Sequence, residues 1–172
     1  MDIRETIHKR RSIRKYRKEK INLKIIYDIL REANLAPSAG NLQARDFIIV
    51  DDDELKYKLA ESALNQNFIA EAPIIIVVCV NLNRIKPYGK RGLELYCIQD
   101  SAVAIDHILL LAVNQGFGTC WIGAFNEKKV SKILKLPEYI RPTALVPIGY
   151  PAEDPDPTPR IPIEKLIHYN NW

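Results

Sequence analysis

The chain has 172 residues, of which 47% are hydrophobic and 27% are charged, and its formal net charge is +4. This length predicts one domain with a substantial core, and three widely spaced cysteines exclude a disulfide scaffold and a zinc module. The longest apolar run, residues 72–80, is too short to span a bilayer, so we expect a cytoplasmic protein without a signal peptide or membrane segment.

The positive charge is concentrated at the N-terminus. Residues 1–20 contain nine Lys and Arg against three acidic residues, a net of +6, so the other 152 residues carry −2. Such a cluster can be a solvated face, a nucleic-acid arm or a pocket for an anion. Nucleic-acid surfaces usually spread their cations further or interleave them with aromatics, so we expect no nucleic-acid partner.

Helices and strands alternate along the chain. Asn22 is predicted to cap a helix whose apolar residues recur at helical spacing until Pro37 stops it. Residues 37–41 have the composition of a loop, and residues 47–50 that of a short strand. The acidic run 51–54 is predicted to begin the next helix.

The middle of the chain is strongly apolar. Residues 74–80 predict a strand buried on both faces. Residues 94–115 are too long for a strand and apolar nearly all round, which predicts a helix buried in a core or against another subunit. Gly116 is placed to end that helix in a left-handed cap.

The remaining elements are short. We predict a strand at 119–122, with Cys120 and Trp121 as core residues, then a helix capped by Asn126 and a strand at 144–148. The proline-rich tail that follows is predicted to lie extended on a surface. The pattern indicates an α/β or α+β fold with the sheet between helices.

The side chains offer little chemistry of their own. His8, His107 and His168 share no ligand spacing, so we expect no metal site. The sequence contains no GxSxG, no phosphate-binding P-loop and no dinucleotide fingerprint. If the protein is an enzyme, a bound cofactor has to supply the reactive atoms.

The N-terminal cluster has the composition of a phosphate site. Arg10, Ser12 and Arg14 would face the same side of an extended chain. Guanidinium forks bind phosphate oxygens in pairs, which a lysine point charge cannot do. Arg11 adds charge nearby.

Four motifs, in this order and spacing, resemble the nitroreductase family of FMN-dependent oxidoreductases over almost the whole chain. They are RRSIRKY (10–16), APSAGNLQ (36–43), GFGTCWIGAF (116–125) and PRIPIEKLIHYN (159–170). The resemblance implies an α+β fold with a central mixed or antiparallel sheet in three layers. It also implies one FMN-binding domain over 1–172, and an intertwined homodimer in which 151–172 forms an arm on the partner subunit.

The resemblance also implies roles for individual residues. Arg10, Ser12 and Arg160 match the family's phosphate ligands, and Arg14 matches a cation near the flavin N1–C2=O edge. Pro37, Ser38 and Ala39 match a loop that the second subunit lays against the flavin, mainly through backbone groups. Asn41 and Gln43 follow in the same motif. Ile122 and Gly123 match the dipeptide whose backbone faces N5. Small residues suit this close approach.

Two differences from the family's pattern limit how far these residue roles can be carried over to this chain. Larger members have an Asn followed three residues later by a Lys in the middle motif; here Asn65 is the match, with Gln66 or Asn67 as alternatives, and Phe68 stands where the Lys would be. The chain also lacks room for the helices that cover the substrate side in larger relatives.

The function implied is hydride transfer from NADH or NADPH through flavin N5 to a nitroaromatic, quinone or similar conjugated acceptor, by a ping-pong mechanism without a catalytic side chain. The alternatives are other flavin chemistry on the same fold, such as flavin fragmentation or reductive dehalogenation, or a non-catalytic flavin- or nucleotide-binding regulator.

Overall fold

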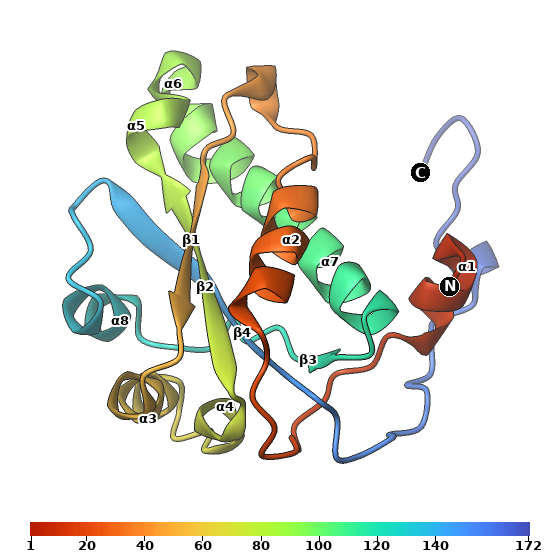
Figure 1. Cartoon of the computed structure of the whole chain (residues 1–172). Helices are drawn as coiled ribbons and strands as arrows, with labels where there is room; N and C mark the ends of the chain where they lie inside the picture. Colours follow the sequence, from red (N-terminus) through yellow and green to blue (C-terminus); the bar gives the residue numbers. More distant parts are fainter.

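A four-stranded antiparallel sheet forms the centre of the molecule (Figure 1). The computed structural model describes residues 1–172. The strand order β1-β2-β4-β3 places β2 and β4 in the middle. The bounds are β1 Arg45–Val50, β2 Ile74–Asn81, β3 Gly118–Thr119 and β4 Ile140–Gly149.

Eight helices and a few single turns complete the fold. A π-helical turn at Gly92–Tyr96 leads directly into the longest helix, and short 3-10 turns occur at Ala39–Asn41, Lys86–Tyr88 and Ile163–Lys165. The helices are α1 Ile3–Lys9, α2 Leu23–Ala33, α3 Asp53–Ser62, α4 Phe68–Glu71, α5 Leu82–Ile85, α6 Gly89–Arg91, α7 Cys97–Asn114 and α8 Glu127–Ile133.

The three layers follow from the alternation of side chains along β2, which is buried throughout as expected. Ile76 and Val78 point into a core shared with α2 and α7. Ile75 and Val77 point to the opposite face, into a core shared with α3, α4 and α8. The α+β, three-layer prediction is confirmed, and the sheet is antiparallel.

Helix capping follows the sequence closely. The Asn22 side chain accepts a hydrogen bond from Lys24 N–H, and the Asn126 side chain accepts one from Lys129 N–H. Gly116 ends α7 with φ +82°, in the left-handed region. The predicted caps at Asn22, Asn126 and Gly116 are therefore confirmed.

The long apolar helix has one buried face and one partly exposed face. In α7, Ile105 and Ile108 pack into the core, whereas Val103 is 37% exposed. The helical stretch Leu82–Asn114 is long and apolar enough to cross a membrane by length and composition alone, and 44% of an 18-residue apolar window within it is buried. A core helix has the same composition, so this is weak support for a membrane segment.

Two strand predictions differ from the structure. The strand expected at 119–122 is β3, which ends at Thr119, and only a single bridge pairs Ile122 with Leu145 further on. Trp121 is consequently 41% exposed, so its assignment to the core was wrong. β4 begins at Ile140, four residues early, because the register shifts where Pro142 pairs with Cys79 and a proline is tolerated at such an irregularity.

The two ends of the chain meet at the start of the C-terminal arm, residues 151–172. Tyr16 bridges Pro151, the Ala152 N–H donates to the Lys15 carbonyl at 2.9 Å, and Arg17 N–H donates to the Tyr150 carbonyl at 2.9 Å. Beyond residue 155 every residue is exposed, and Figure 1 shows the C-terminus away from the sheet.

Candidate functional site

The N-terminal cations lie on an extended segment that is pinned to β3. Ser12 forms a parallel bridge with Thr119, and Ile13 N–H donates to the Thr119 carbonyl at 2.8 Å. Ile13 is buried, so the side chains on either side of it point outward. This places Arg10, Ser12 and Arg14 as the sequence predicted for an extended chain.

Arg10, Ser12 and Arg14 all lie close enough to the Cys120 thiol to influence its pKa. Burial raises the pKa of Cys120, and the charge of Arg14, a hydrogen bond with Ser12 and the charge of Arg10 oppose that rise. Cys120 is 3% exposed, which confirms it as a core residue. Two predicted phosphate ligands, Arg10 and Ser12, and the predicted ring cation Arg14 therefore lie in one region of the molecule.

The guanidinium groups of Arg10 and Arg14 form no ion pair and no hydrogen bond within the chain. Arg14 instead lies over the ring of Phe68, 5.9 Å from the ring centroid. Arg11 differs, because its head group donates to the carbonyls of His8 at 2.6 Å and Arg10 at 2.9 Å, at the end of α1. Two free guanidinium groups beside a hydroxyl form a natural anion site.

The Arg14–Phe68 contact also brings the middle motif to this region. Asn65 adopts a left-handed conformation with φ +57° and is exposed in the turn after α3. The Gln66 side chain is already engaged with the Ala63 carbonyl at 2.9 Å. Asn65 and Asn67 are therefore the amides of this turn that remain free.

The dipeptide Ile122–Gly123 presents one free backbone donor. Both backbone groups of Ile122 are already hydrogen-bonded: its N–H donates to the Leu145 carbonyl at 2.9 Å, and its carbonyl accepts from the Leu145 N–H at 3.0 Å. The Gly123 N–H donates to no group in the chain, and a Cβ built on Gly123 would meet nothing within 4 Å. Of the two residues, Gly123 offers the donor and the open space that a flat ligand needs.

The loop 37–43 is held far from these residues. Its Ala39 N–H donates to the Asp100 carboxylate at 2.9 Å, near the start of α7, whereas Ser12 pairs just beyond the end of α7. At 1.5 Å per residue, Asp100 and Asn114 are about 21 Å apart along the helix. Within one chain, the predicted ring-binding loop and the predicted phosphate ligands are not brought together.

Within the loop, the predicted residues form a compact turn. The Ser38 hydroxyl accepts from Gln43 N–H at 3.0 Å, and the Gln43 side chain donates to the Asn41 carbonyl at 3.1 Å. Pro37 and Asn41 are exposed.

Arg160 lies in the exposed arm. Its guanidinium donates to the Thr158 and Pro159 carbonyls at 3.1 and 3.3 Å and contacts neither Arg10 nor Ser12. The chain alone does not bring this predicted phosphate ligand to the other two.

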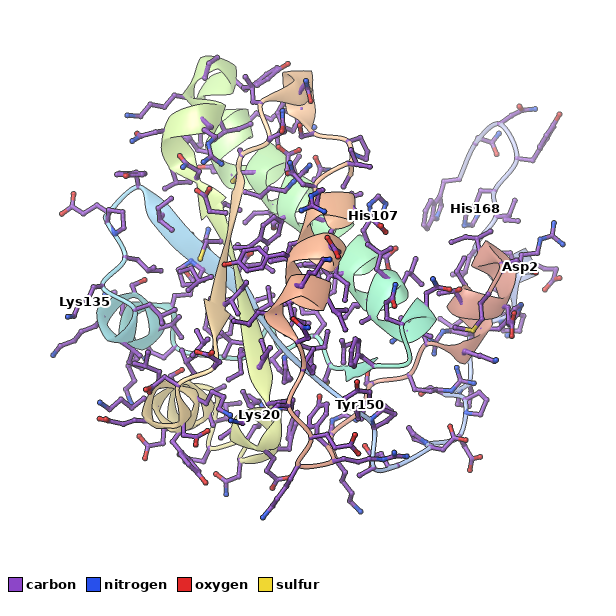
Figure 2. All side chains as sticks on the ribbon, in the orientation of Figure 1. Asp2, Lys20, His107, Lys135, Tyr150 and His168 are labelled. Atoms are coloured by element: carbon purple, nitrogen blue, oxygen red, sulfur yellow. The ribbon has the colours of Figure 1, made fainter.

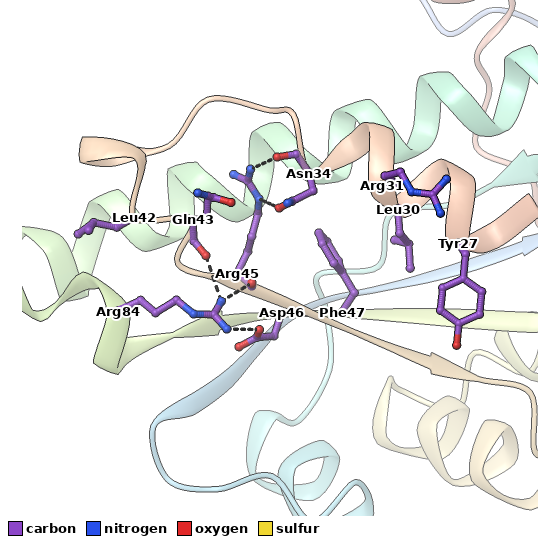
Figure 3. Close-up of a pocket in the computed structure, with 10 residues that line it drawn as sticks. All are labelled: Tyr27, Leu30, Arg31, Asn34, Leu42, Gln43, Arg45, Asp46, Phe47 and Arg84. Carbon is purple, nitrogen blue, oxygen red and sulfur yellow. Dashed lines mark hydrogen bonds and ion pairs between the residues drawn. The ribbon is translucent and has the colours of Figure 1, made fainter. Parts of the chain in front are cut away.

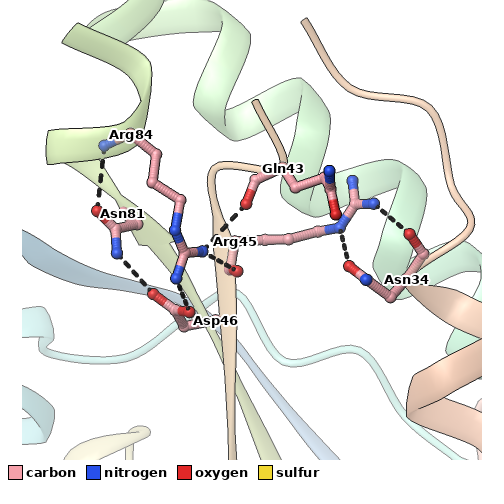
Figure 4. A network of polar contacts seen from close by, with 6 residues as sticks. All are labelled: Asn34, Gln43, Arg45, Asp46, Asn81 and Arg84. Atoms are coloured by element: carbon pink, nitrogen blue, oxygen red, sulfur yellow. Dashed lines mark hydrogen bonds and ion pairs between the residues drawn. The ribbon is translucent and has the colours of Figure 1, made fainter. Parts of the chain in front are cut away.

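A pocket of about 630 Å³ lies beside α2 and β1 (Figure 3). Like the N-terminal segment, this pocket is lined by arginines, but two of their charges are already paired with carboxylates. Arg84 pairs with Asp46 at 2.6 Å, and Arg31 pairs with Asp28. Figure 4 shows Arg84 and Arg45 directed at protein oxygens. This pocket has no free cation for a phosphate, unlike the Arg10–Arg14 region.

No group of three or more His, Cys, Asp or Glu side chains is placed to hold a metal ion. His107 lies on α7 and His168 in the arm (Figure 2).

Three residues that the sequence did not assign to the site contact predicted site residues or the segments that carry them. Glu153 accepts from the Arg14 backbone N–H at 2.6 Å. Arg45 and Asp100, both buried, bind the loop 37–43 and the residues before it. The Glu153–Arg14 and Asp100–Ala39 contacts join positions 139 and 61 residues apart, and no local pattern indicates such pairs.

Comparison with known proteins gives a consistent picture. The model of the Nitroreductase family matches residues 7–69 and 62–150. An NADH dehydrogenase from Thermus thermophilus is 29% identical, over 97% of this chain and 95% of the relative. An FMN reductase [NAD(P)H] from Bacillus subtilis is 31% identical, over 94% of this chain and 71% of the relative. The solved structure of B. megaterium NfrA2 superposes with a TM-score of 0.92 at 30% identity, covering 100% of this chain and 76% of that one.

Proposed function

The chain belongs to the nitroreductase family of NAD(P)H-dependent oxidoreductases, and we propose that it binds FMN and passes electrons from NADH or NADPH to a conjugated acceptor by a ping-pong mechanism. The observation that carries the proposal is that Arg10, Ser12 and Arg14 lie on one extended segment paired with β3 and near the Cys120 thiol, and that the guanidinium groups of Arg10 and Arg14 have no hydrogen-bond or ion-pair partner within the chain. The free Gly123 N–H with open space before it supports the same assignment.

The residues fit the phosphate end of the cofactor. Arg10 offers paired donors to phosphate oxygens, and Ser12 adds a hydroxyl donor beside it. The Arg160 guanidinium binds only two neighbouring carbonyls within the chain, so it is available for a third contact. We assign it to the phosphate once the arm has packed against the dimer.

The residues also fit the ring. When bound, the flavin supplies hydride transfer at N5. Arg14 places a positive charge beside the ring, where it favours the reduced, negatively charged form. The Gly123 N–H would be free to donate to the N5 edge, and the free amides of Asn65 and Asn67 would be available to the polar edge of the ring.

The site is completed by a second copy of the chain. The loop carrying Pro37, Ser38, Ala39, Asn41 and Gln43 lies too far from Arg10 to serve the same cofactor within one protomer. We therefore assign this loop to the flavin of the partner subunit, in a homodimer with residues 151–172 as an arm on the partner. The partly exposed apolar face of α7 suits such an interface.

The acceptor is a flat conjugated compound, such as a nitroaromatic or a quinone, that can stack on the flavin. We place the protein in the cytoplasm, where its three free, buried cysteines stay reduced.

Steady-state kinetics on the FMN-loaded protein test this function. We expect NADH or NADPH to bleach the flavin absorbance and a quinone to restore it. Double-reciprocal plots should give parallel lines, as ping-pong mechanisms do. Protein that takes up FMN but is not bleached by either nucleotide would indicate a binding protein. Protein that stays colourless with FMN and shifts DNA would indicate that the N-terminal cations bind nucleic acid.

A further inference from the structure

The loop 37–43, together with residues 34–36 before it, has a strained backbone that needs contacts from outside to keep its conformation. Asn41 and Gln43 have φ values of +56° and +49°, and Gly40 has +55°. Non-glycine residues in this region cost about 1–3 kcal/mol each and persist only where the surroundings fix them. A Cβ on Gly40 would collide with the Tyr88 hydroxyl, so this turn is also packed tightly from outside.

Arg45 fixes the first half of the loop. Its side chain is 3% exposed, and its guanidinium donates to three loop carbonyls: Asn34 at 2.8 Å, Ala36 at 2.7 Å and Pro37 at 3.3 Å. A further bond reaches the Asn34 side chain at 3.3 Å (Figure 4). Only the arginine fork has donors enough to bind all of these acceptors at once.

Asp100 fixes the second half. Its side chain is 4% exposed, and one carboxylate oxygen accepts from Ala39 N–H at 2.9 Å, whereas the other has no partner. Burial lowers the pKa of Arg45, and the charge of Asp100 opposes that fall. Each charge thus lowers the cost of burying the other.

A buried pair of charges is not by itself a source of stability, since well-packed apolar groups often serve the fold as well. What apolar groups cannot do is orient the carbonyls and the N–H of an irregular loop. The bonds made by Arg45 and Asp100 go almost entirely to residues 34–39.

We propose that Arg45 and Asp100 are positioning residues, which set the backbone of residues 36–43 before any cofactor is present. The proposal deepens the assignment of this loop to the partner's flavin and rests on that proposed function. A loop fixed in advance loses no conformational freedom on binding, so the pair raises ring affinity without touching the ring.

Hydrogen exchange on FMN-free protein tests the positioning step. We compare wild type with Asp100→Ala, Asp100→Asn and Arg45→Met, and use Ser101→Ala as the matched control. Ser101 is also buried and lies on the same turn of α7, but its hydroxyl donates to the Ile98 carbonyl and not to the loop.

Peptides covering 36–43 should exchange at least about tenfold faster in Asp100→Ala and Arg45→Met, since a lost bond to a charged group is worth that factor or more. Asp100→Asn retains an acceptor oxygen and should show a smaller change. Ser101→Ala should match wild type, and β2 should stay protected in every variant.

Measurements of flavin affinity then distinguish the positioning role of Asp100 from a role in binding the phosphate. Asp100→Ala should weaken FMN and riboflavin by the same factor, about tenfold. Equal exchange in Asp100→Ala and Ser101→Ala would overturn the proposal, and so would loss of β2 protection together with the loop, which would make Asp100 a support of the whole fold. If wild type bound no FMN, the proposed function would fail, and the exchange comparison would still decide the positioning role.

Discussion

The Glu153 carboxylate accepts a hydrogen bond from the Arg14 backbone N–H at 2.6 Å, which joins the start of the C-terminal arm to the cation predicted to face the flavin. The start of the arm is also held here by the antiparallel bridge between Tyr16 and Pro151, whose two backbone hydrogen bonds do not need this side chain. Glu153 is thus an anion that the fold itself places beside the proposed phosphate site.

Glu153→Gln should therefore tighten FMN binding. The amide keeps an acceptor for Arg14 N–H and removes a negative charge that repels the phosphate. Near a surface such a charge is worth about 0.5–1 kcal/mol, so FMN affinity should rise roughly two- to fivefold. Fluorescence titration with FMN and with riboflavin checks this, and riboflavin affinity should not change. Weaker binding of both flavins would mean that the carboxylate acts by holding the Arg14 backbone.

Arg10→Ala should remove a paired, charge-assisted contact to the phosphate. Hydrogen bonds to charged groups contribute roughly 1.5–3 kcal/mol, so FMN affinity should fall about 10- to 150-fold. Lys18→Ala is the control, because Lys18 is an exposed cation of the same segment, and its affinity change should stay under about twofold. Equal loss of FMN and riboflavin in Arg10→Ala would show that Arg10 supports the ring or the fold and not the phosphate.

Two glycines distinguish space reserved for a ligand from space used by packing. A Cβ at Gly123 meets nothing, so Gly123→Ala should change the free energy of unfolding by less than about 0.5 kcal/mol. The same methyl group should weaken FMN binding fivefold or more, as overpacking costs about 1–3 kcal/mol.

Gly118→Ala is the opposite case. Its Cβ would come within 2.7 Å of the Ile13 side chain, so unfolding should be easier by about 1–3 kcal/mol even without FMN. Urea unfolding of both FMN-free variants checks the pair. A Gly123→Ala variant that binds FMN as wild type does would remove Gly123 from the site.

Alkaline pH should destabilise the protein through its buried thiols. Burial raises the pKa of Cys79 from 9.0 to about 12, with a smaller contribution from Asp46. Because the thiol pKa is higher in the folded state than in the unfolded state, the unfolded state loses this proton first as the pH rises. The contribution of the protonated thiol to the free energy of unfolding is therefore complete below pH 9 and is lost between pH 9 and 12. At pH 10.5 the loss from this one group is about 2 kcal/mol.

Urea unfolding at pH 7.5, 9 and 10.5 checks the thiol prediction. Cys79→Ala should be less stable than wild type at pH 7.5 but should lose less stability as the pH rises. If the free energy of unfolding of both proteins fell equally with rising pH, groups other than Cys79 would account for the loss of stability at alkaline pH.

The extended geometry predicted for the N-terminal segment is found because the evidence for it is local. The alternation of Arg10, Ser12 and Arg14 needs only an extended chain, and pairing with β3 supplies it. Helix α1 was not predicted, although Asp2 caps it by accepting from Glu5 N–H, three residues on. Its few turns and high charge hid the helical period.

The errors and omissions arise where tertiary contacts decide. Trp121 follows a strand pattern, but β3 stops two residues earlier and leaves the ring exposed. Asp100 and Ala39 are 61 positions apart, and nothing in either local sequence indicates that they meet. Residue types therefore indicate candidate cofactor-binding groups, whereas the structure was needed to find what positions them.

The central claim, that each FMN site takes its phosphate ligands from one chain and its loop from another, is tested most directly by complementation. Arg10→Ala damages the phosphate end, and Gly40→Val damages the loop, because valine there has an unfavourable φ and collides with Tyr88. Each variant alone should give a folded dimer that retains little FMN. Co-expressed with different affinity tags and purified as the mixed dimer, the two should bind about one FMN per dimer, since one site is then built from the two undamaged halves. A mixed dimer as empty as its parents would contradict the account and place the whole site within a single chain.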